Sequence, residues 1–258
     1  MHVARQAGAC GAIVTGVDVA AVDDDTFEQL HTAFLEHHVL AFRDQMLTPD
    51  QQLAFAARWG DVFVHPYVPS IEGHPGIMEI YQMVDITETW HADVTFAERP
   101  PKITMLYARI IPEVGGDTMF ASQHRAYEEL SAGMQGMLQG LRAVHYGTER
   151  ARDANLEPQQ VTCAQPVVIT HPETGRRALY VNGNYTRHFE NMTERESRPL
   201  LEFLYAHASQ PEYTYRHRWQ VGDLLMWDNR SVQHRGVHDH GAAERRMHRV
   251  TIQGDRLS

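Results

Sequence analysis

The feature of this sequence that most constrains its fold is a series of short apolar segments whose composition favours β-strands. Examples are HVLAFR, KITMLYARI, DTMFAS and DLLMWDN, which are rich in β-branched, aromatic and other apolar residues. Turn-forming residues such as Gly115-Gly116-Asp117 separate these segments. The pattern predicts a mainly β fold with flanking helices, built as a β-sandwich or jelly roll whose mouth can hold a metal site.

Helical patterns are confined to a few segments that would flank this core. The three clearest cover residues 23–38, 48–60 and 193–208, and each opens on an acidic residue or threonine that can cap a helix. A weaker pattern covers residues 125–138. Because no internal repeat and no Pro/Gly/Ser-rich linker divides the chain, we expect a single domain over residues 1–258.

Charge and composition exclude several classes of partner. The formal net charge of -10 disfavours binding to nucleic acid or to an anionic membrane, which needs a basic surface. Cys10 and Cys163 form no C-x-x-C pair, so neither a disulfide framework nor a thiolate zinc site is expected. The sequence has no apolar run of membrane-spanning length and no signal-peptide pattern, which predicts a cytoplasmic protein.

The stretch TETWHADVTF carries a histidine and an aspartate two residues apart, His91 and Asp93. Its Thr, Trp, Val and Phe residues predict a strand, on which residues i and i+2 project to one face and could hold one ion. A carboxylate and a neutral imidazole suit Fe(II), Mn(II) or Zn(II). The alternative at this point is that Asp93 is a surface acid and His91 an ordinary polar residue of the strand.

A third metal ligand is available in LLMWDNRSVQHRGVHDH, where His234 follows an apolar strand and a polar turn. His238 and His240 are competing candidates. Two histidines and one carboxylate on one face of an ion form the facial triad of non-haem iron oxygenases, which leaves positions open for other ligands. Zinc would more often use a closed ligand set or a third histidine.

Two arginines, Arg245 and Arg249, follow in ERRMHRVTIQGD and would project to the same side of a strand. Guanidinium groups near a metal match carboxylate, sulfate or sulfonate anions. Alternatively, both could be surface arginines paired with Glu244 or Asp255.

Several of these motifs together resemble one enzyme family. WHADVTF, GGDTMFAS, HPETGRRALYVN, QVGDLLMWDNRSVQHRGV and RRMHRVTIQGD are similar to the Fe(II)/2-oxoglutarate-dependent taurine dioxygenase and chlorophenoxyacetate dioxygenase family. The similarity extends from Gly11 to Gly254 in the order and spacing of that family. It implies a double-stranded β-helix, which is the jelly-roll core, that uses Fe(II), 2-oxoglutarate and O₂.

The resemblance also implies roles for individual residues. Fe(II) would be held by His91, Asp93 and His234. Thr118 and Arg245 would bind the distal carboxylate of 2-oxoglutarate, and Arg249 would face the anionic group of the primary substrate. Arg245 and Arg249 lie eleven and fifteen residues after His234, as in the taurine enzyme. If the two arginines exchanged roles, the class of reaction would be the same.

Further substrate contacts are implied for His65 and for the backbone N–H of Val94. Val68 and Thr87 stand where the taurine enzyme has a tyrosine and an asparagine contact, which argues against taurine as the substrate. The segments SIEGHP and MTERESRPLLEFLYAHA resemble the aryloxypropionate branch of the family.

The implied activity is hydroxylation of a C–H bond in a small anionic substrate, such as a sulfonate, an alkyl sulfate or an aryloxyalkanoate. Succinate and CO₂ would be released, and hydroxylation beside sulfur or oxygen would lead to C–S or C–O cleavage. Two alternatives stay open: a non-catalytic jelly-roll protein that binds an anion or a metal, and a zinc hydrolase with the same ligands. Family members are often dimers or tetramers, so we expect a homo-oligomer.

Overall fold

Fifteen short β-strands form most of the regular structure in the described part of the chain. The computed structural model describes residues 1–64, 69–81, 89–147 and 161–258. The strands pair almost entirely in antiparallel fashion, as the alternating segments of the sequence predict. They are β1 (His2–Arg5), β2 (Ala12–Thr15), β3 (Val39–Phe42), β4 (Met78–Tyr81), β5 (Ile103–Ile110), β6 (Thr118–Ser122), β7 (Arg142–Tyr146), β8 (Thr162–Pro166), β9 (Val168–Thr170), β10 (Arg177–Leu179), β11 (Thr186–Phe189), β12 (Thr214–His217), β13 (Leu224–Asp228), β14 (Val232–Gly236) and β15 (Arg246–Ile252).

The helices lie where the capping patterns place them. The side chains of Asp23, Thr48 and Thr193 each accept a hydrogen bond from the backbone N–H three residues later, which fixes the first turn of a helix. The weaker pattern over residues 125–138 divides into two short helices. Within the described residues, no helix is long and apolar enough to span a bilayer. The α-helices are α1 (Asp24–His37), α2 (Pro49–Ala57), α3 (Gln123–Glu128), α4 (Ala132–Leu138) and α6 (Glu194–Ala208).

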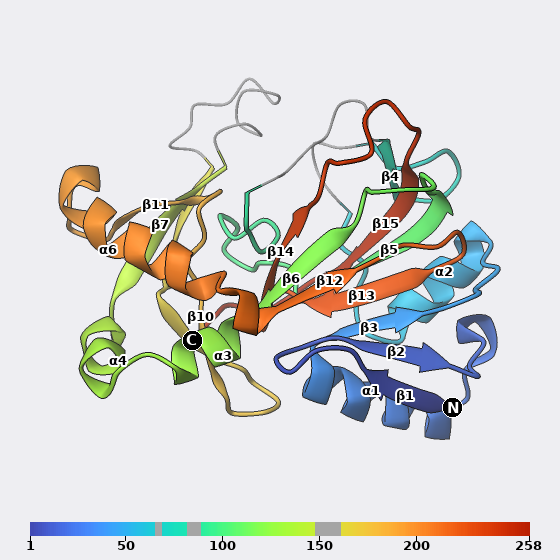
Figure 1. Ribbon diagram of the computed structural model, residues 1–258, viewed down its shortest axis with the longest axis horizontal. Helices are drawn as coiled ribbons and strands as arrows, with labels where there is room; N and C mark the ends of the chain where they lie inside the picture. The colour runs from blue at the N-terminus through green and yellow to red at the C-terminus, as the bar shows by residue number, and fades with distance from the viewer. Residues whose placement is uncertain (65–68, 82–88, 148–160) are drawn as a thin grey trace.

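Two sheets facing each other form the jelly roll. The larger sheet has seven strands in the order β1-β2-β3-β13-β5-β15-β4, and the smaller has three in the order β12-β6-β14 (Figure 1). Only β2 and β3 run parallel within the larger sheet. The chain passes repeatedly between the two sheets, so the expected mainly β fold with flanking helices is confirmed.

The core between the two sheets is made by side chains that alternate inward along their strands. Phe120 and Val232 of the smaller sheet pack with Leu225, Trp227 and Met247 of the larger one. Each of these side chains is at least 99% buried. Burial of a side chain of this size contributes about 1.5–3 kcal/mol to stability, so this layer holds the two sheets in a fixed relation.

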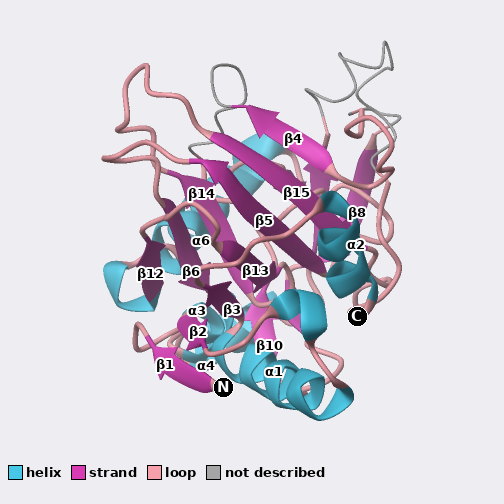
Figure 2. Cartoon of the chain, turned by 90° about the vertical axis from the view of Figure 1, so that its right-hand side faces the viewer, coloured by secondary structure: helices cyan, strands magenta, loops and turns pink. Residues whose placement is uncertain are grey.

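Two further cores lie outside the jelly roll. Helices α1 and α2 cover the outer face of the seven-stranded sheet, where Phe34, Phe55 and Trp59 pack on Met105 and Val250 (Figure 2). A separate three-stranded sheet, β11-β7-β8, packs with α3, α4 and α6 on the other side of the molecule (Figure 1). The outer layers leave the interior between the two sheets as the place where polar side chains converge.

Three buried histidines are held in their neutral form by the fold. Burial lowers the pKa of His38 and of His145 to about 3 each, and that of His124 to about 4. His124 bonds to Arg177 O at 2.8 Å, and His145 bonds to the Thr95 hydroxyl at 2.8 Å. In the unfolded chain a histidine has a pKa of about 6.5. Between that pH and about 4, the unfolded chain therefore binds more protons than the folded chain does.

This difference predicts a loss of stability on acidification. Stability should be complete above about pH 6.5 and should fall as the pH drops towards 4, by up to about 1.4 kcal/mol per pH unit for each histidine. We expect the Tm to be clearly lower at pH 5 than at pH 7 in a thermal denaturation series. In His145→Gln the dependence on pH should be shallower, and a Tm that is equal at the two pH values would contradict this account.

Candidate metal centre

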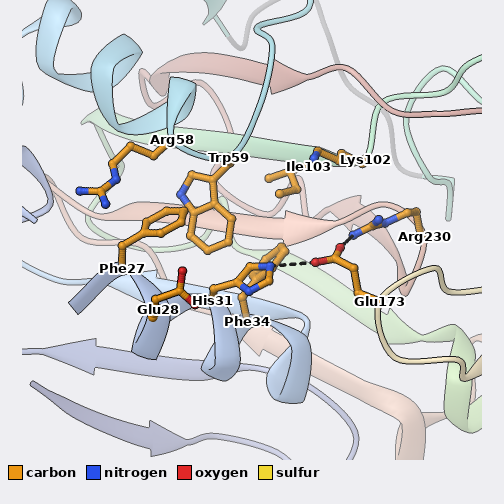
Figure 3. Close-up of a pocket in the computed structure, with 10 residues that line it drawn as sticks. All are labelled: Phe27, Glu28, His31, Phe34, Arg58, Trp59, Lys102, Ile103, Glu173 and Arg230. Atoms are coloured by element: carbon orange, nitrogen blue, oxygen red, sulfur yellow. Dashed lines mark hydrogen bonds and ion pairs between the residues drawn. The ribbon is translucent and has the colours of Figure 1, made fainter. Parts of the chain in front are cut away.

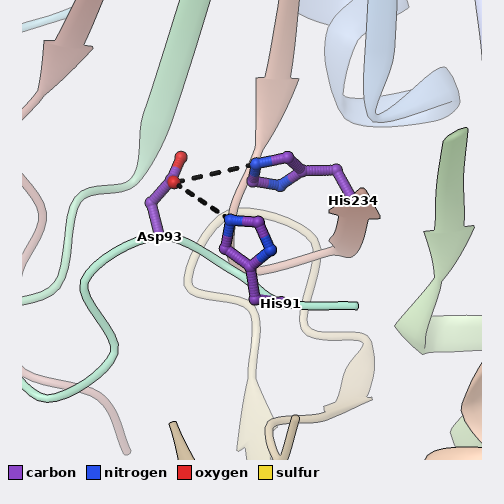
Figure 4. Close-up of side chains that lie close together, drawn as sticks. All are labelled: His91, Asp93 and His234. Atoms are coloured by element: carbon purple, nitrogen blue, oxygen red, sulfur yellow. Dashed lines mark ion pairs between the residues drawn. The ribbon is translucent and has the colours of Figure 1, made fainter. Parts of the chain in front are cut away.

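Three potential metal ligands meet in the interior of the jelly roll. One side-chain ligand atom from each of His91, Asp93 and His234 lies within 4.8 Å of the others, and all three residues are buried (Figure 4). Asp93 Oδ1 is 3.8 Å from His91 Nε2 and 3.7 Å from His234 Nε2. The structure therefore brings together the three residues that the sequence analysis selected as a triad.

The backbone brings the two histidines together by a route other than the predicted strand. His91 N–H donates to His234 O at 3.1 Å and His234 N–H donates to His91 O at 2.7 Å, which forms an isolated bridge to β14. The prediction of a strand that continues through Asp93 is wrong. Residues 93–96 form a turn with Val94 at φ 49°, and Ala97 N–H donates back to Val94 O. This turn, rather than strand alternation, aims Asp93 at the imidazoles.

The Asp93 carboxylate is held from two strands of the larger sheet. Arg249 Nη2 lies 2.8 Å from Oδ1, and the Thr104 hydroxyl donates to Oδ2 at 2.7 Å. Burial alone would raise the pKa of Asp93, but Arg249, the two imidazoles and the Thr104 hydroxyl together hold this pKa below its ordinary value. The group is therefore an anion at neutral pH, as a metal ligand must be.

Both imidazoles are prepared to offer a lone pair. Burial lowers the pKa of His91 and lowers the pKa of His234 still further, so both rings are neutral at pH 7. His91 Nδ1 lies 2.9 Å from Thr89 O, which can only accept, so the ring proton is on Nδ1 and the lone pair on Nε2. The ring of His234 packs against Trp227, with 4.6 Å between their centroids. Nε2 of each ring is the atom that lies towards Asp93.

The two separations from Asp93 Oδ1 are compatible with a single divalent transition-metal ion. Nitrogen and oxygen ligands lie about 2.0–2.2 Å from such an ion, so two ligands of one ion are at most about 4.4 Å apart. The 3.7 and 3.8 Å separations from Asp93 Oδ1 satisfy this limit. Two neutral imidazoles and one carboxylate also match the donor set of non-haem iron sites.

A second group of polar residues is organised around Trp219. The indole N–H of Trp219 donates to Thr118 Oγ1 at 3.0 Å. The Cζ atom of Arg245 lies 5.7 Å from the centroid of the Trp219 ring. Arg245 Nε donates to Gly116 O at 3.0 Å, and among the described residues its guanidinium makes no other hydrogen bond and no ion pair. Burial lowers the pKa of Arg245 to about 10, although Asp117 opposes the shift. A buried cation of this kind favours a bound anion.

The smaller sheet connects this group to the triad. In its register His234 lies opposite Phe120 and Gly236 lies opposite Thr118. Thr118 and His234 therefore project from the same face of the sheet as diagonal neighbours, about 7 Å apart. An elongated molecule with a carboxylate at each end could reach from the triad to Thr118 and Arg245.

Neither arginine pairs with Glu244 or Asp255, the acids considered as alternative partners. Glu244 pairs with Arg246, and Asp255 pairs with an arginine elsewhere in the chain. The single strand expected to carry both Arg245 and Arg249 is shorter than predicted, because β15 begins at Arg246 and has a bulge directly after it. Arg245 nevertheless reaches the interior beside Trp219, and Arg249 reaches Asp93.

Some of the other residues selected from the sequence lie within the described residues, and others do not. His65, Val68 and Thr87 lie outside the described residues. His238 and His240, the alternative third ligands, are not members of the metal-ligand group found in the described part of the chain. The backbone N–H of Val94 makes no hydrogen bond to any described residue, so it is available to a ligand beside Asp93.

Three site residues were not selected from the sequence: Thr104, Trp219 and Asn229. In the sequence Thr104 is one polar residue between two apolar neighbours in KITM, and only the structure shows that it is fully buried. Asn229 ends the segment DLLMWDN, where an asparagine is typical of any turn. Trp219 follows β12, and nothing in its sequence neighbourhood indicates a bond to Thr118.

A cavity of about 220 Å³ lies elsewhere, beneath α1 and α2 on the outer face of the seven-stranded sheet (Figure 3). Three of its lining groups pair with one another, since Glu173 accepts from His31 at 2.8 Å and from Arg230 at 3.1 Å. None of the three candidate metal ligands lines this cavity.

If the triad binds the metal, His234→Ala should weaken binding of Mn(II) by more than roughly 100-fold. That factor is the largest loss expected when a residue that only hydrogen-bonds to a metal ligand is removed. Asp93→Ala should do the same, because each substitution removes one of three ligand atoms. Isothermal titration calorimetry on the purified variants measures the effect. His238→Ala, which removes a neighbouring histidine outside the triad, should bind as the wild-type protein does, and equal loss in that variant would contradict the assignment.

Comparison with known proteins places the chain in a family. Residues 3–251 match the model of the family described as "Taurine catabolism dioxygenase TauD, TfdA family". The chain is 36% identical to an alkylsulfatase of Acinetobacter baylyi, over 99% of this chain and 86% of the relative. It is 34% identical to an alpha-ketoglutarate-dependent sulfate ester dioxygenase of Pseudomonas putida, over 96% of this chain and 88% of the relative.

The fold gives the same result. A crystal structure of a taurine dioxygenase from Burkholderia xenovorans superimposes with a TM-score of 0.89 and 36% identity, and the match covers 99% of this chain and 90% of that one. The similarity includes both the jelly roll and the flanking helices, since nearly the whole of each chain is matched. The chain therefore belongs to the TauD/TfdA family of dioxygenases that use alpha-ketoglutarate, which is 2-oxoglutarate.

Proposed function

We propose that this protein is an Fe(II)- and 2-oxoglutarate-dependent dioxygenase that hydroxylates a small alkyl sulfate ester at the carbon bearing the sulfate. The observation that carries the proposal is the pairing of a buried two-histidine, one-carboxylate triad with a buried arginine, Arg245, that has no counterion among the described residues. Sulfate esters are favoured among the anionic substrates because the alkylsulfatase and the sulfate ester dioxygenase are similar over nearly the full chain.

His91, Asp93 and His234 would hold the iron. When bound, Fe(II) would supply the reaction of O₂ with 2-oxoglutarate that releases succinate and CO₂ and oxidises the substrate C–H bond. The protein's part is positioning: a site of this kind works by fixing the reacting atoms relative to one another. One oxygen atom of O₂ enters the substrate and the other enters succinate.

We infer that Arg245 and Thr118 bind the distal carboxylate of 2-oxoglutarate. The planar guanidinium of Arg245 can donate two parallel hydrogen bonds to a carboxylate. The Thr118 hydroxyl already accepts a hydrogen bond from the Trp219 N–H, so its own proton can be donated to the same carboxylate. The diagonal arrangement of Thr118 and His234 on one sheet face supports a dicarboxylate that extends from the metal to this pair.

We infer that Arg249 faces the sulfate of the substrate. Its guanidinium is beside Asp93, and the Val94 N–H, which bonds to no described residue, adjoins the same carboxylate residue, so an anion near both would lie next to the metal. His65 and Thr87 are proposed as further contacts on the strength of the family resemblance alone. Hydroxylation at the carbon next to the ester oxygen gives a hemiacetal-like sulfate, which collapses to an aldehyde and inorganic sulfate.

The reaction is tested by assaying the purified protein with Fe(II), 2-oxoglutarate, O₂ and a small primary alkyl sulfate. We expect succinate, aldehyde and sulfate in equal amounts, and neither aldehyde nor sulfate without O₂. Parallel assays with alkyl sulfonates and aryloxyalkanoates rank the substrate classes. A zinc hydrolase would instead release an alcohol and sulfate without O₂, and a non-catalytic binding protein would form no product. Either result would sink the proposal.

The two arginines predict separable kinetic effects. A hydrogen bond to a charged group contributes about 1.5–3 kcal/mol, so Arg245→Met should raise the KM for 2-oxoglutarate by roughly 10- to 100-fold. Arg249→Met should raise the KM for the alkyl sulfate by a similar factor. Steady-state kinetics with each substrate varied in turn measures both effects. If the two effects are exchanged, the roles are exchanged; if neither KM changes, the anion sites are assigned wrongly.

A further inference from the structure

The side-chain amide of Asn229 contacts Asp93 both directly and through a second residue. Asn229 Oδ1 accepts the backbone N–H of Asp93 at 3.2 Å and the indole N–H of Trp227 at 3.1 Å. Asn229 Nδ2 donates to Thr104 Oγ1 at 3.0 Å, and Thr104 Oγ1 lies 2.7 Å from Asp93 Oδ2. Asn229 and Thr104 are at least 99% buried, so water does not compete for these bonds.

The direction of every hydrogen bond in this network is determined by chemistry. The two N–H groups that meet Asn229 can only donate, so the amide oxygen must face them and the amide nitrogen must face Thr104. The Thr104 oxygen then accepts from Asn229, and its own proton is directed to Asp93 Oδ2, which can only accept as a carboxylate. If the Asn229 amide were flipped, its NH₂ group would face the N–H groups of Asp93 and Trp227, and these buried donors would have no acceptor.

The network is anchored by the larger sheet. Trp227 lies directly opposite Thr104 in the pairing of β13 with β5, so both side chains project to the same interior face. Asn229 follows at the end of β13, and its backbone N–H donates to Lys102 O at 2.9 Å. The next residue, Arg230, is tied to Asp228 through three hydrogen bonds, which fixes the turn that carries Asn229.

We propose that Asn229 and Thr104 are positioning residues that select which oxygen of Asp93 binds the metal. Oδ2 receives the Thr104 proton, whereas Oδ1, which also lies 2.8 Å from Arg249 Nη2, is the oxygen 3.7–3.8 Å from the two imidazole nitrogens. The Thr104 bond would therefore favour coordination through Oδ1 alone. A second carboxylate oxygen on the ion would occupy a position that a facial triad leaves for cosubstrate and O₂. The inference rests on the proposed function, since it concerns the same metal.

The first test compares Thr104→Val with Thr104→Ser. Valine has nearly the same shape but no hydroxyl, and we expect the affinity for Mn(II), measured by calorimetry, to fall by about 10- to 100-fold. We also expect an altered electron paramagnetic resonance spectrum of bound Mn(II), because Oδ2 is released to coordinate. Serine restores the hydroxyl, so Thr104→Ser should recover both the affinity and the spectrum.

A matched control is Thr186→Val. Thr186 is 3% exposed, and its hydroxyl accepts the Asn182 backbone N–H at 3.0 Å, so the substitution also removes a buried hydroxyl that is hydrogen-bonded. Its Tm should fall, as for Thr104→Val, while its Mn(II) affinity and spectrum should match the wild-type protein. If Thr104→Val lowers the Tm but leaves affinity and spectrum at their wild-type values, Thr104 is only structural and the inference is wrong.

The relay through Asn229 is tested by a double-mutant cycle. Asn229→Leu should weaken Mn(II) binding by a factor similar to that of Thr104→Val, and the double variant should show little further loss, because both remove one network. Fully multiplicative losses would contradict a relay. If the wild-type protein itself does not bind Mn(II), the proposed function fails together with this inference. If the wild-type protein binds and Thr104→Val binds equally well, only the inference fails.

Discussion

The candidate site depends on one backbone interaction, the reciprocal pair of hydrogen bonds between His91 and His234. Two residues that exchange both bonds in this way have Cα atoms about 5.5 Å apart, so their side chains emerge next to each other. His234 is fixed within β14, and the bridge fixes His91 relative to it. Asp93 then needs only a tight turn to complete the triad. The jelly roll matters for the chemistry mainly because it holds β14 and the segment before β5 at this separation.

The charge of the side chains at the candidate site is opposite in sign to the net charge of the whole chain. The protein carries a formal net charge of -10, yet Arg249 lies beside Asp93, and the buried Arg245 makes no ion pair with any described residue. With a divalent ion in the triad, these groups would leave three positive charges. Dianionic 2-oxoglutarate and the proposed sulfate ester would together supply three negative charges, which would satisfy the requirement that buried charges be compensated. This balance explains why small anions suit the site although the overall charge disfavours polyanions.

The sequence predicts the fold and the triad better than it predicts the local geometry. Helix caps such as Thr48 and Thr193 are local signals, and the structure confirms them. The strand expected through Asp93 failed because a turn with Val94 at positive φ follows His91, and β-branched residues give no warning of that conformation. Thr104 and Asn229 could not be identified because their importance arises from contacts across two strands, and an isolated threonine or asparagine carries no sign of such a partner.

We propose that one divalent ion is held by His91, Asp93 and His234 and that 2-oxoglutarate extends from it to Arg245. The most direct measurement is a crystal structure of the protein grown with Mn(II) and 2-oxoglutarate, in which the manganese is located by its anomalous scattering. The account predicts one strong peak bonded to both Nε2 atoms and to Oδ1 of Asp93 alone, with the distal carboxylate on Arg245 and Thr118. An ion bound elsewhere, or a cosubstrate that does not contact Arg245, would contradict it.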